Sequence, residues 1–160
     1  MAFNPRHLWL VLGLLLASLA GTALFKAWPV IFPQLEQRME LDPSCNLRAG
    51  PCVSSLPDGG KLSFSISPRD IPTLSPLQLE VQISNSQAYS VEVDFSGVDM
   101  YMGYNRVRLQ EQAAGSYQAE ARLPVCVRDA MEWEAQVLLR GKRGYVSVPF
   151  RFITLKAGAL

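Results

Sequence analysis

An uncharged run of eighteen residues, from Leu8 to Phe25, restricts the folding of this chain more than any other feature of the sequence. A helix of this length can cross the hydrocarbon core of a bilayer, and Trp28 suits the membrane interface that follows. A cleaved signal peptide is the competing interpretation, with Ser18-Leu19-Ala20 as an acceptable cleavage site. Because the apolar run is longer than the usual signal core, the sequence favours an uncleaved N-terminal transmembrane helix.

The charges on either side of this run predict its orientation. Arg6 and the terminal amine precede it, whereas only Lys26 lies close behind it. The positive-inside rule therefore leaves the short amino end in the cytoplasm and the rest of the chain outside. In a bacterium, this topology is that of a single-pass inner-membrane protein whose C-terminal domain is periplasmic and whose first partner is the lipid bilayer.

Composition divides the chain into three parts. Residues 1–28 are predicted to form a cytoplasmic stub and the transmembrane anchor. Residues 29–60 are predicted to form a stalk, in which QLEQRMEL has a short helical pattern, and a segment that contains two cysteines. Residues 61–156 are predicted to form a β-sandwich domain.

Apolar and polar residues alternate with a period of two through most of this last part, as in strands that bury one face. Turn residues separate the alternating runs, and Gly141 and Gly144 predict a hairpin between the last two. We therefore expect a mainly β fold, a seven-stranded antiparallel immunoglobulin-like sandwich. The predicted strands are Leu62–Ile66, Leu77–Ile83, Tyr89–Phe95, Val107–Leu109, Tyr117–Leu123, Met131–Leu139 and Val146–Phe152.

Charge and histidine content exclude several functions. The formal net charge is +1, which gives no field to attract nucleic acid. The only histidine, His7, precedes the apolar run, so the predicted sandwich has no imidazole for a catalytic triad or for most zinc sites. No nucleophile elbow, phosphate-binding loop or dinucleotide fingerprint is present. We therefore expect a protein that is not an enzyme.

The three cysteines are an odd number for an oxidising compartment. Cys45 and Cys52 close a short loop in which Gly50-Pro51 can turn the chain, and a disulfide between them is the first expectation. The alternatives are pairing of either one with Cys126 and a metal or redox role. If the first two pair, Cys126 is left as a thiol.

Sulfur-containing side chains gather in the stretch from Val98 to Met131. Met100 and Met102 are two residues apart, so an extended chain points both sulfurs the same way, and Cys126 precedes the strand that Met131 opens. Thioether and thiolate ligands select Cu(I) over harder divalent ions. The sequence therefore predicts a copper site made by Met100, Met102, Cys126 and Met131. The alternative is that these side chains fill the end of the core or contact another protein.

Three short motifs in this region resemble the periplasmic sandwich proteins of the FixH and YtkA-like type. They are Met100-x-Met102-Gly103, Gly115-x-Tyr117-x-Ala119-x-x-x-Leu123-Pro124 and Met131-x-Trp133. The resemblance implies an N-terminal anchor and an immunoglobulin-like domain associated with copper supply and with the assembly of respiratory oxidases. It also marks Met100 and Met102 as metal-site candidates. This chain departs from the pattern in its Cys45–Cys52 segment, in Cys126 and in lacking histidine in the predicted outer domain.

Two functions follow from these features. The first is a membrane-tethered extracytoplasmic protein that binds Cu(I) and assists the metallation of a respiratory oxidase, so that the oxidase or its assembly proteins are partners. The second is a non-metal interaction or assembly module of a membrane complex, which uses the same loops as its contact surface. Arg140, Lys142 and Arg143 near the predicted hairpin turn are interpreted as solubilising charges, with contact to lipid headgroups or a partner as the alternative.

Overall fold

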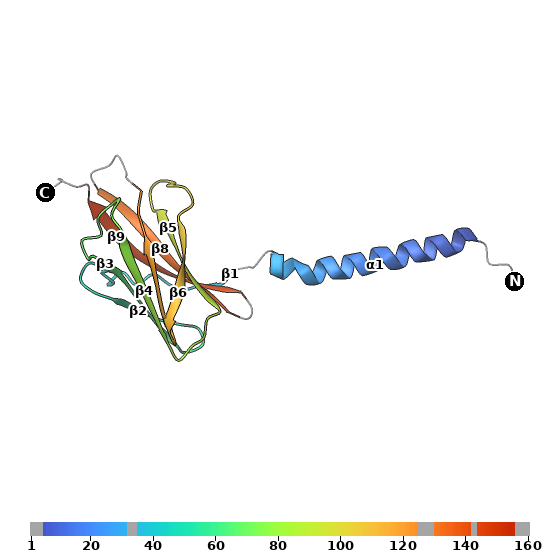
Figure 1. Cartoon of the computed structure of the whole chain (residues 1–160), viewed down its shortest axis with the longest axis horizontal. Coiled ribbons are helices and arrows are strands. Elements are labelled where there is room, and N and C mark those ends of the chain that lie inside the picture. Colours follow the sequence, from blue (N-terminus) through green and yellow to red (C-terminus); the bar gives the residue numbers. More distant parts are fainter. Residues whose placement is uncertain (1–4, 32–34, 125–129, 142–143, 156–160) are drawn as a thin grey trace. The chain divides into compact units, whose positions relative to one another are not determined.

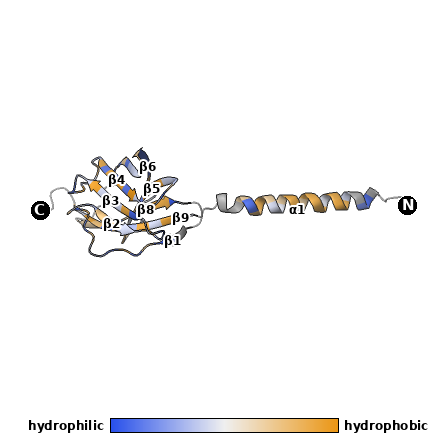
Figure 2. Cartoon of the chain, turned by 90° about the horizontal axis from the view of Figure 1, so that it is seen from below, coloured by the Kyte–Doolittle hydropathy of each residue, from blue (hydrophilic) through white to orange (hydrophobic). Residues whose placement is uncertain are grey.

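The computed structural model describes residues 5–31, 35–124, 130–141 and 144–155, and it divides the chain into two units, Met1–Gln34 and Leu35–Leu160. The first unit contains the helix α1, Pro5–Ile31 (Figure 1). Its stretch Trp9–Ala27 is long and apolar enough to cross a membrane, and none of it is buried within the chain. Figure 2 shows hydrophobic residues along most of this helix. The helix is therefore consistent with a single-pass anchor.

The described residues of the second unit form nine strands (Figure 1). All pairings between them are antiparallel except that of β1 with β9, which is parallel. The strands are β1 Leu35–Arg38, β2 Cys52–Ser55, β3 Lys61–Ser67, β4 Leu77–Ser84, β5 Ser90–Gly97, β6 Arg106–Ala113, β7 Ser116–Ala121, β8 Ala130–Arg140 and β9 Tyr145–Leu155.

These strands form one curled sheet in the order β1-β9-β8-β5-β6-β7-β4-β3-β2. β6 pairs with β5 through its first half and with β7 through its second half, so it belongs to both halves of the sheet. Phe64 of β3 and Phe150 of β9, which are far apart in this order, have ring centroids 5.2 Å apart. The two halves therefore face each other across a shared core, as in a sandwich, but they are joined through β6.

The mainly β class is confirmed, whereas a strictly antiparallel sandwich of seven strands is wrong. The two additional strands, β1 and β2, come from residues 29–60, the part of the sequence predicted to form a stalk and a Cys-containing segment. The short helix expected in QLEQRMEL is also wrong, because Leu35–Arg38 is a strand. A four-residue strand is too short to show an alternating pattern, and pairing with β9 overrides the local preference of Glu, Gln and Arg for helix.

Alternating side chains of the long strands fill the core. In β8, Met131, Trp133 and Ala135 point inward and are buried. The indole N–H of Trp133 donates a hydrogen bond to Oγ1 of the buried Thr154, 3.0 Å away in β9. This bond supplies the partner that a fully buried indole needs.

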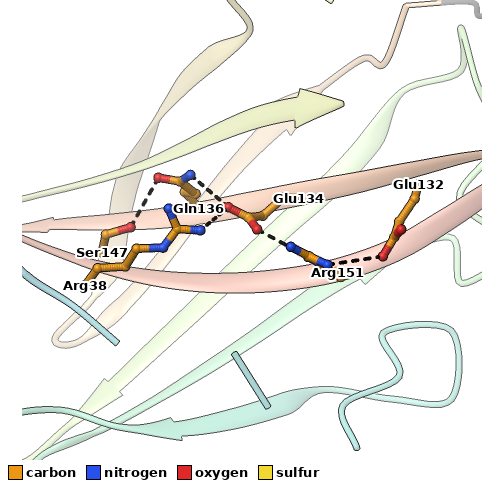
Figure 3. A network of polar contacts seen from close by, with 6 residues as sticks. All are labelled: Arg38, Glu132, Glu134, Gln136, Ser147 and Arg151. Carbon is orange, nitrogen blue, oxygen red and sulfur yellow. Dashed lines mark hydrogen bonds and ion pairs between the residues drawn. The ribbon is translucent and has the colours of Figure 1, made fainter. Parts of the chain in front are cut away.

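The outer face of β8 holds a buried carboxylate, Glu134, in a network of polar contacts (Figure 3). Its oxygens accept hydrogen bonds from Arg38 Nη2 at 2.6 Å, Gln136 Nε2 at 2.9 Å and Arg151 Nε at 3.3 Å. Ser147 donates to the side-chain oxygen of Gln136 at 3.3 Å. Because Arg38 lies in β1 and Arg151 in β9, the network fastens the parallel edge strand to its neighbours.

The predicted disulfide between Cys45 and Cys52 is present, with the two Cα atoms 5.6 Å apart. The loop that it closes carries Leu47, which is fully buried in the core. Cys52 is the first residue of β2, so the bond ties this loop to the edge of the sheet.

We expect the Cys45→Ser/Cys52→Ser variant to lose about 2–3 kcal/mol of folding free energy, because the unfolded chain gains the freedom of the opened loop. Urea unfolding of the full chain in detergent, followed by tryptophan fluorescence, measures this loss. Reduction of the unmodified chain should give the same midpoint as the variant. Equal midpoints for the oxidised chain and the variant would show that the loop is held by packing alone.

Candidate metal centre

The predicted methionine ligands lie at one end of the curled sheet. β5 ends at Gly97 and β6 begins at Arg106, and the segment between them, residues 98–105, is the methionine loop (Figure 1). Gly97 pairs with Trp133 in β8, and the main-chain N–H of Val98 donates to the carbonyl of Glu132 at 3.0 Å. Met131 precedes these residues in β8, so it lies at the same end as the loop.

Three methionines come together around Gly97. A Cβ atom at Gly97 would lie 3.2 Å from Cγ of Met102, and closer still to the main-chain oxygen of Met100 and to Cε of Met131. The sulfur of Met102 is bonded to this Cγ and the sulfur of Met131 to this Cε. The side chains of Met102 and Met131, from distant parts of the sequence, therefore both approach Gly97, at a position where a larger side chain would displace its neighbours.

Burial differs among the three side chains. Met131 is 6% exposed and belongs to the hydrophobic core, whereas Met100 and Met102 are partly buried and pack against that core. The site is consequently apolar on its inner side and reachable from the loop side. The same arrangement also fits the packing alternative, because methionine fills irregular gaps at the ends of cores.

The fourth predicted ligand, Cys126, lies within residues 125–129, outside the described part of the chain. Among the described residues, no group of three or more His, Cys, Asp or Glu side chains is placed to hold a metal ion.

Two carboxylates on β5, the strand that leads into the methionine loop, form ion pairs with an arginine. Arg106 of β6 lies 2.8 Å from Asp94 and 3.7 Å from Glu92, both on β5. Burial of the guanidinium alone would lower the pKa of Arg106, but its hydrogen bond and charge interaction with Asp94 raise that pKa overall. Asp94 thus has a permanent cationic partner, which makes it a poor ligand for a metal.

Two tyrosines of the methionine loop were missed by the sequence reasoning. Tyr101 is 88% exposed and Tyr104 is 78% exposed. The guanidinium carbon of Arg106 lies 5.6 Å from the ring centroid of Tyr104, a cation–π contact that supports this ring from one side. The signal was present in the sequence YMGY, since each tyrosine follows directly on a residue of the Met100-x-Met102-Gly103 motif.

Comparisons with protein-family models, with curated proteins and with solved structures give no match to this chain. The resemblance to the FixH and YtkA-like proteins therefore remains an expectation based on short motifs. The features of this chain that bear on its function are the geometry of the methionine loop and the apolar helix.

We expect Gly97→Ala to destabilise the protein by about 1–3 kcal/mol, since the added methyl group must displace both the main chain at Met100 and the side chain of Met131. Urea unfolding of the full chain measures this change. Gly50→Ala is the matched control, because a Cβ there meets no atom within 4 Å, and it should shift stability by less than about 0.5 kcal/mol. An unchanged midpoint for Gly97→Ala would show that the three methionines do not crowd this glycine in solution.

Proposed function

We propose that this chain is a membrane-tethered extracytoplasmic protein that binds and handles Cu(I). The observation that carries the proposal is the approach of Met102 and Met131 to one point beside Gly97, at the base of the methionine loop. Met100 precedes this point on the same loop, and Cys126 is proposed as a fourth sulfur ligand.

The chemistry of the donors supports Cu(I) as the metal. Thioethers are soft, uncharged ligands that bind Cu(I) well and Zn²⁺ or Mg²⁺ poorly. The buried side of the site, formed by Met131 and the core behind it, excludes water and disfavours the more strongly hydrated Cu(II). The exposed side of the loop leaves a route by which a receiving protein can take the metal.

The apolar helix and the resemblance supply the proposed setting. In this proposal α1 is the membrane anchor. The second unit, Leu35–Leu160, is the β unit, and it lies on the periplasmic side of the inner membrane. A respiratory oxidase, or one of its assembly proteins, receives the copper. This destination is the part of the proposal that depends on the family resemblance alone.

The test is a Cu(I) titration of the full chain in detergent micelles, without oxygen, against a chromophoric chelator of known Cu(I) affinity. We expect the protein to remove one equivalent of Cu(I) per chain from the chelator. An excess of Zn²⁺ should not reduce the amount of Cu(I) that the protein removes. A chelator that keeps all of its Cu(I) in the presence of excess protein would refute the proposal.

An interaction module is the second candidate, and the two exposed tyrosines favour it. Aromatic residues and methionine are enriched in protein contact surfaces, where they supply buried area at low entropic cost. Tyr101 and Tyr104 project from the methionine loop with most of their surface in solvent. A photo-crosslinking residue at position 101, tested in native membranes, should then give one dominant adduct. A similar residue at Gln112, on the distant β6–β7 hairpin, should give none.

A further inference from the structure

A shallow groove lies at the other end of the sheet from the methionine loop. Its volume is about 380 Å³, and its lining includes Tyr89, Ser90, Arg108 and Arg140. Ser90 begins β5 and pairs with Arg140, at the end of β8, whereas the methionine loop follows the last residue of β5. The groove and the proposed copper site are therefore separated by the length of β5, which is about 25 Å for eight residues.

The two arginines in the groove differ from their neighbours on the same face of the sheet. Arg106 and Arg151 each lie within 4 Å of two carboxylates. Arg108 and Arg140 make no ion pair in the part of the chain that the structure describes. Glu92 stands opposite Arg108 in the strand register, but its carboxylate is paired with Arg106 instead.

A phosphate group matches this pair of guanidiniums. Arginine binds phosphate oxygens through two parallel N–H donors, and two arginines without carboxylate partners leave this capacity unused. Tyr89 is 65% exposed beside them and offers a hydroxyl donor together with an apolar ring. Tyrosine is enriched at membrane interfaces because its ring and hydroxyl suit the boundary between acyl chains and headgroups.

The path of the chain indicates where such a phosphate comes from. Leu35, the first residue of β1, pairs with Tyr145, and Tyr145 pairs with Arg140, so the chain joins the β unit beside the groove. The apolar stretch of α1 ends at Ala27, eight positions before Leu35, a distance that even an extended chain limits to about 27 Å.

We propose that this groove, defined by Arg108, Arg140, Tyr89 and Ser90, binds the phosphate of an anionic phospholipid headgroup of the bilayer that anchors the chain. The proposal rests on the membrane tether of the proposed function, but not on copper. Headgroup binding holds the end of the β unit that joins the tether at the membrane surface.

Arginine modification of the full chain in lipid nanodiscs tests this binding. Phenylglyoxal reacts with accessible guanidiniums, and mass spectrometry of peptides reports the rate at each arginine. In discs containing phosphatidylglycerol we expect Arg108 and Arg140 to react several-fold more slowly than in discs of phosphatidylcholine alone. Arg122, whose side chain is 64% exposed on the other half of the sheet, is the internal control and should react equally in both.

The outcomes of this experiment distinguish a lipid phosphate from a soluble one. They also distinguish failure of the headgroup proposal from failure of the proposed membrane tether. Equal protection by millimolar inorganic phosphate in phosphatidylcholine discs would overturn the lipid assignment in favour of a soluble anion. Equal reactivity in all discs would overturn the groove as an anion site. If the chain does not co-elute with the discs, the tether itself is wrong, and the headgroup proposal fails with it. The copper titration in micelles does not depend on any of these results.

A pair of variants gives a second, independent measurement. Binding to the folded state alone raises the apparent unfolding temperature. We expect phosphatidylglycerol to raise this temperature for the unmodified chain and for Arg122→Gln, but not for Arg108→Gln/Arg140→Gln. The shift should shrink as salt increases, because exposed charges are screened. A shift of the same size in the double variant would overturn the proposal.

Discussion

Cu(I) affinity should fall by at least about 100-fold when Met100 and Met102 are both replaced by leucine. Loss of a residue that only orients a metal ligand costs about 10- to 100-fold in affinity, and removal of the ligands themselves should cost more. Leucine keeps most of the apolar volume, so the fold should be retained at a cost below about 1.5 kcal/mol. Met131→Leu should lower the affinity as well, because its side chain approaches the same point beside Gly97. The chelator competition with the full chain in micelles gives each dissociation constant.

Met39→Leu is the matched control for these variants. Met39 is also partly buried against the core, but its main-chain N–H binds the carbonyl of Ser147, in β9 and away from the methionine loop. Its replacement should leave Cu(I) affinity unchanged. If the Met100/Met102 and Met39 variants bind Cu(I) equally well, the loop methionines serve packing or protein contact.

Cys126→Ser distinguishes a thioether site from a mixed one. A cysteine must lose its proton to bind a metal, so a site that includes it binds Cu(I) more tightly as the pH rises. We expect this pH dependence in the unmodified chain and its loss in Cys126→Ser. Identical pH profiles for the two proteins would remove the thiolate from the site.

Glu134→Ala should produce the largest loss of stability of any single polar replacement on the outer face of the sheet, about 2–4 kcal/mol. The carboxylate is 9% exposed, and its removal leaves Arg38, Arg151 and Gln136 without their shared acceptor. The side chains of Arg38 and Arg151 are 50% and 41% exposed, so water recovers part of the cost and the lower half of the range is expected. Urea unfolding of the full chain measures it.

The control for this prediction is an exposed pair of the same type. Glu120 and Arg122 lie 3.4 Å apart, with half or more of each side chain in solvent. Glu120→Ala should cost less than about 1 kcal/mol. If both variants lose the same small amount, the network around Glu134 contributes no more than a surface ion pair, and β1 is held by its main-chain pairing alone.

The long strands could be predicted from sequence because each carries its own alternating pattern. The runs at Leu77–Ile83 and Met131–Leu139 lie within β4 and β8 almost residue for residue. The hairpin at Gly141 and Gly144 is confirmed by the antiparallel pairing of β8 with β9 and by the hydrogen bond between these two glycines at 2.8 Å. The disulfide of Cys45 with Cys52 is confirmed too, since a short loop with a turn leaves the two cysteines near each other.

What could not be predicted depends on contacts between distant segments. β1 is a strand because it pairs with β9, and β2 is a strand because it pairs with β3. No local sequence pattern predicts either pairing. Gly97 shows no signal in the sequence as a site residue, because its role is to leave space for Met131, which is 34 positions away. The burial of Glu134 is likewise invisible in a sequence where Glu alternates with apolar residues as on any solvated face.

The curled sheet ends on β1 and β2, and this bears on self-association. Strands at the margin of a sheet offer unpaired main-chain donors and acceptors to a second molecule, and long flat ones template aggregation. Here both edge strands are only four residues long. β1 is held by the hydrogen bond of Arg38 to Glu134, and β2 begins at Cys52, which is disulfide-bonded to Cys45. Two copies of the chain at high local concentration therefore find few unpaired main-chain groups on these margins, and strand-to-strand polymerisation is disfavoured.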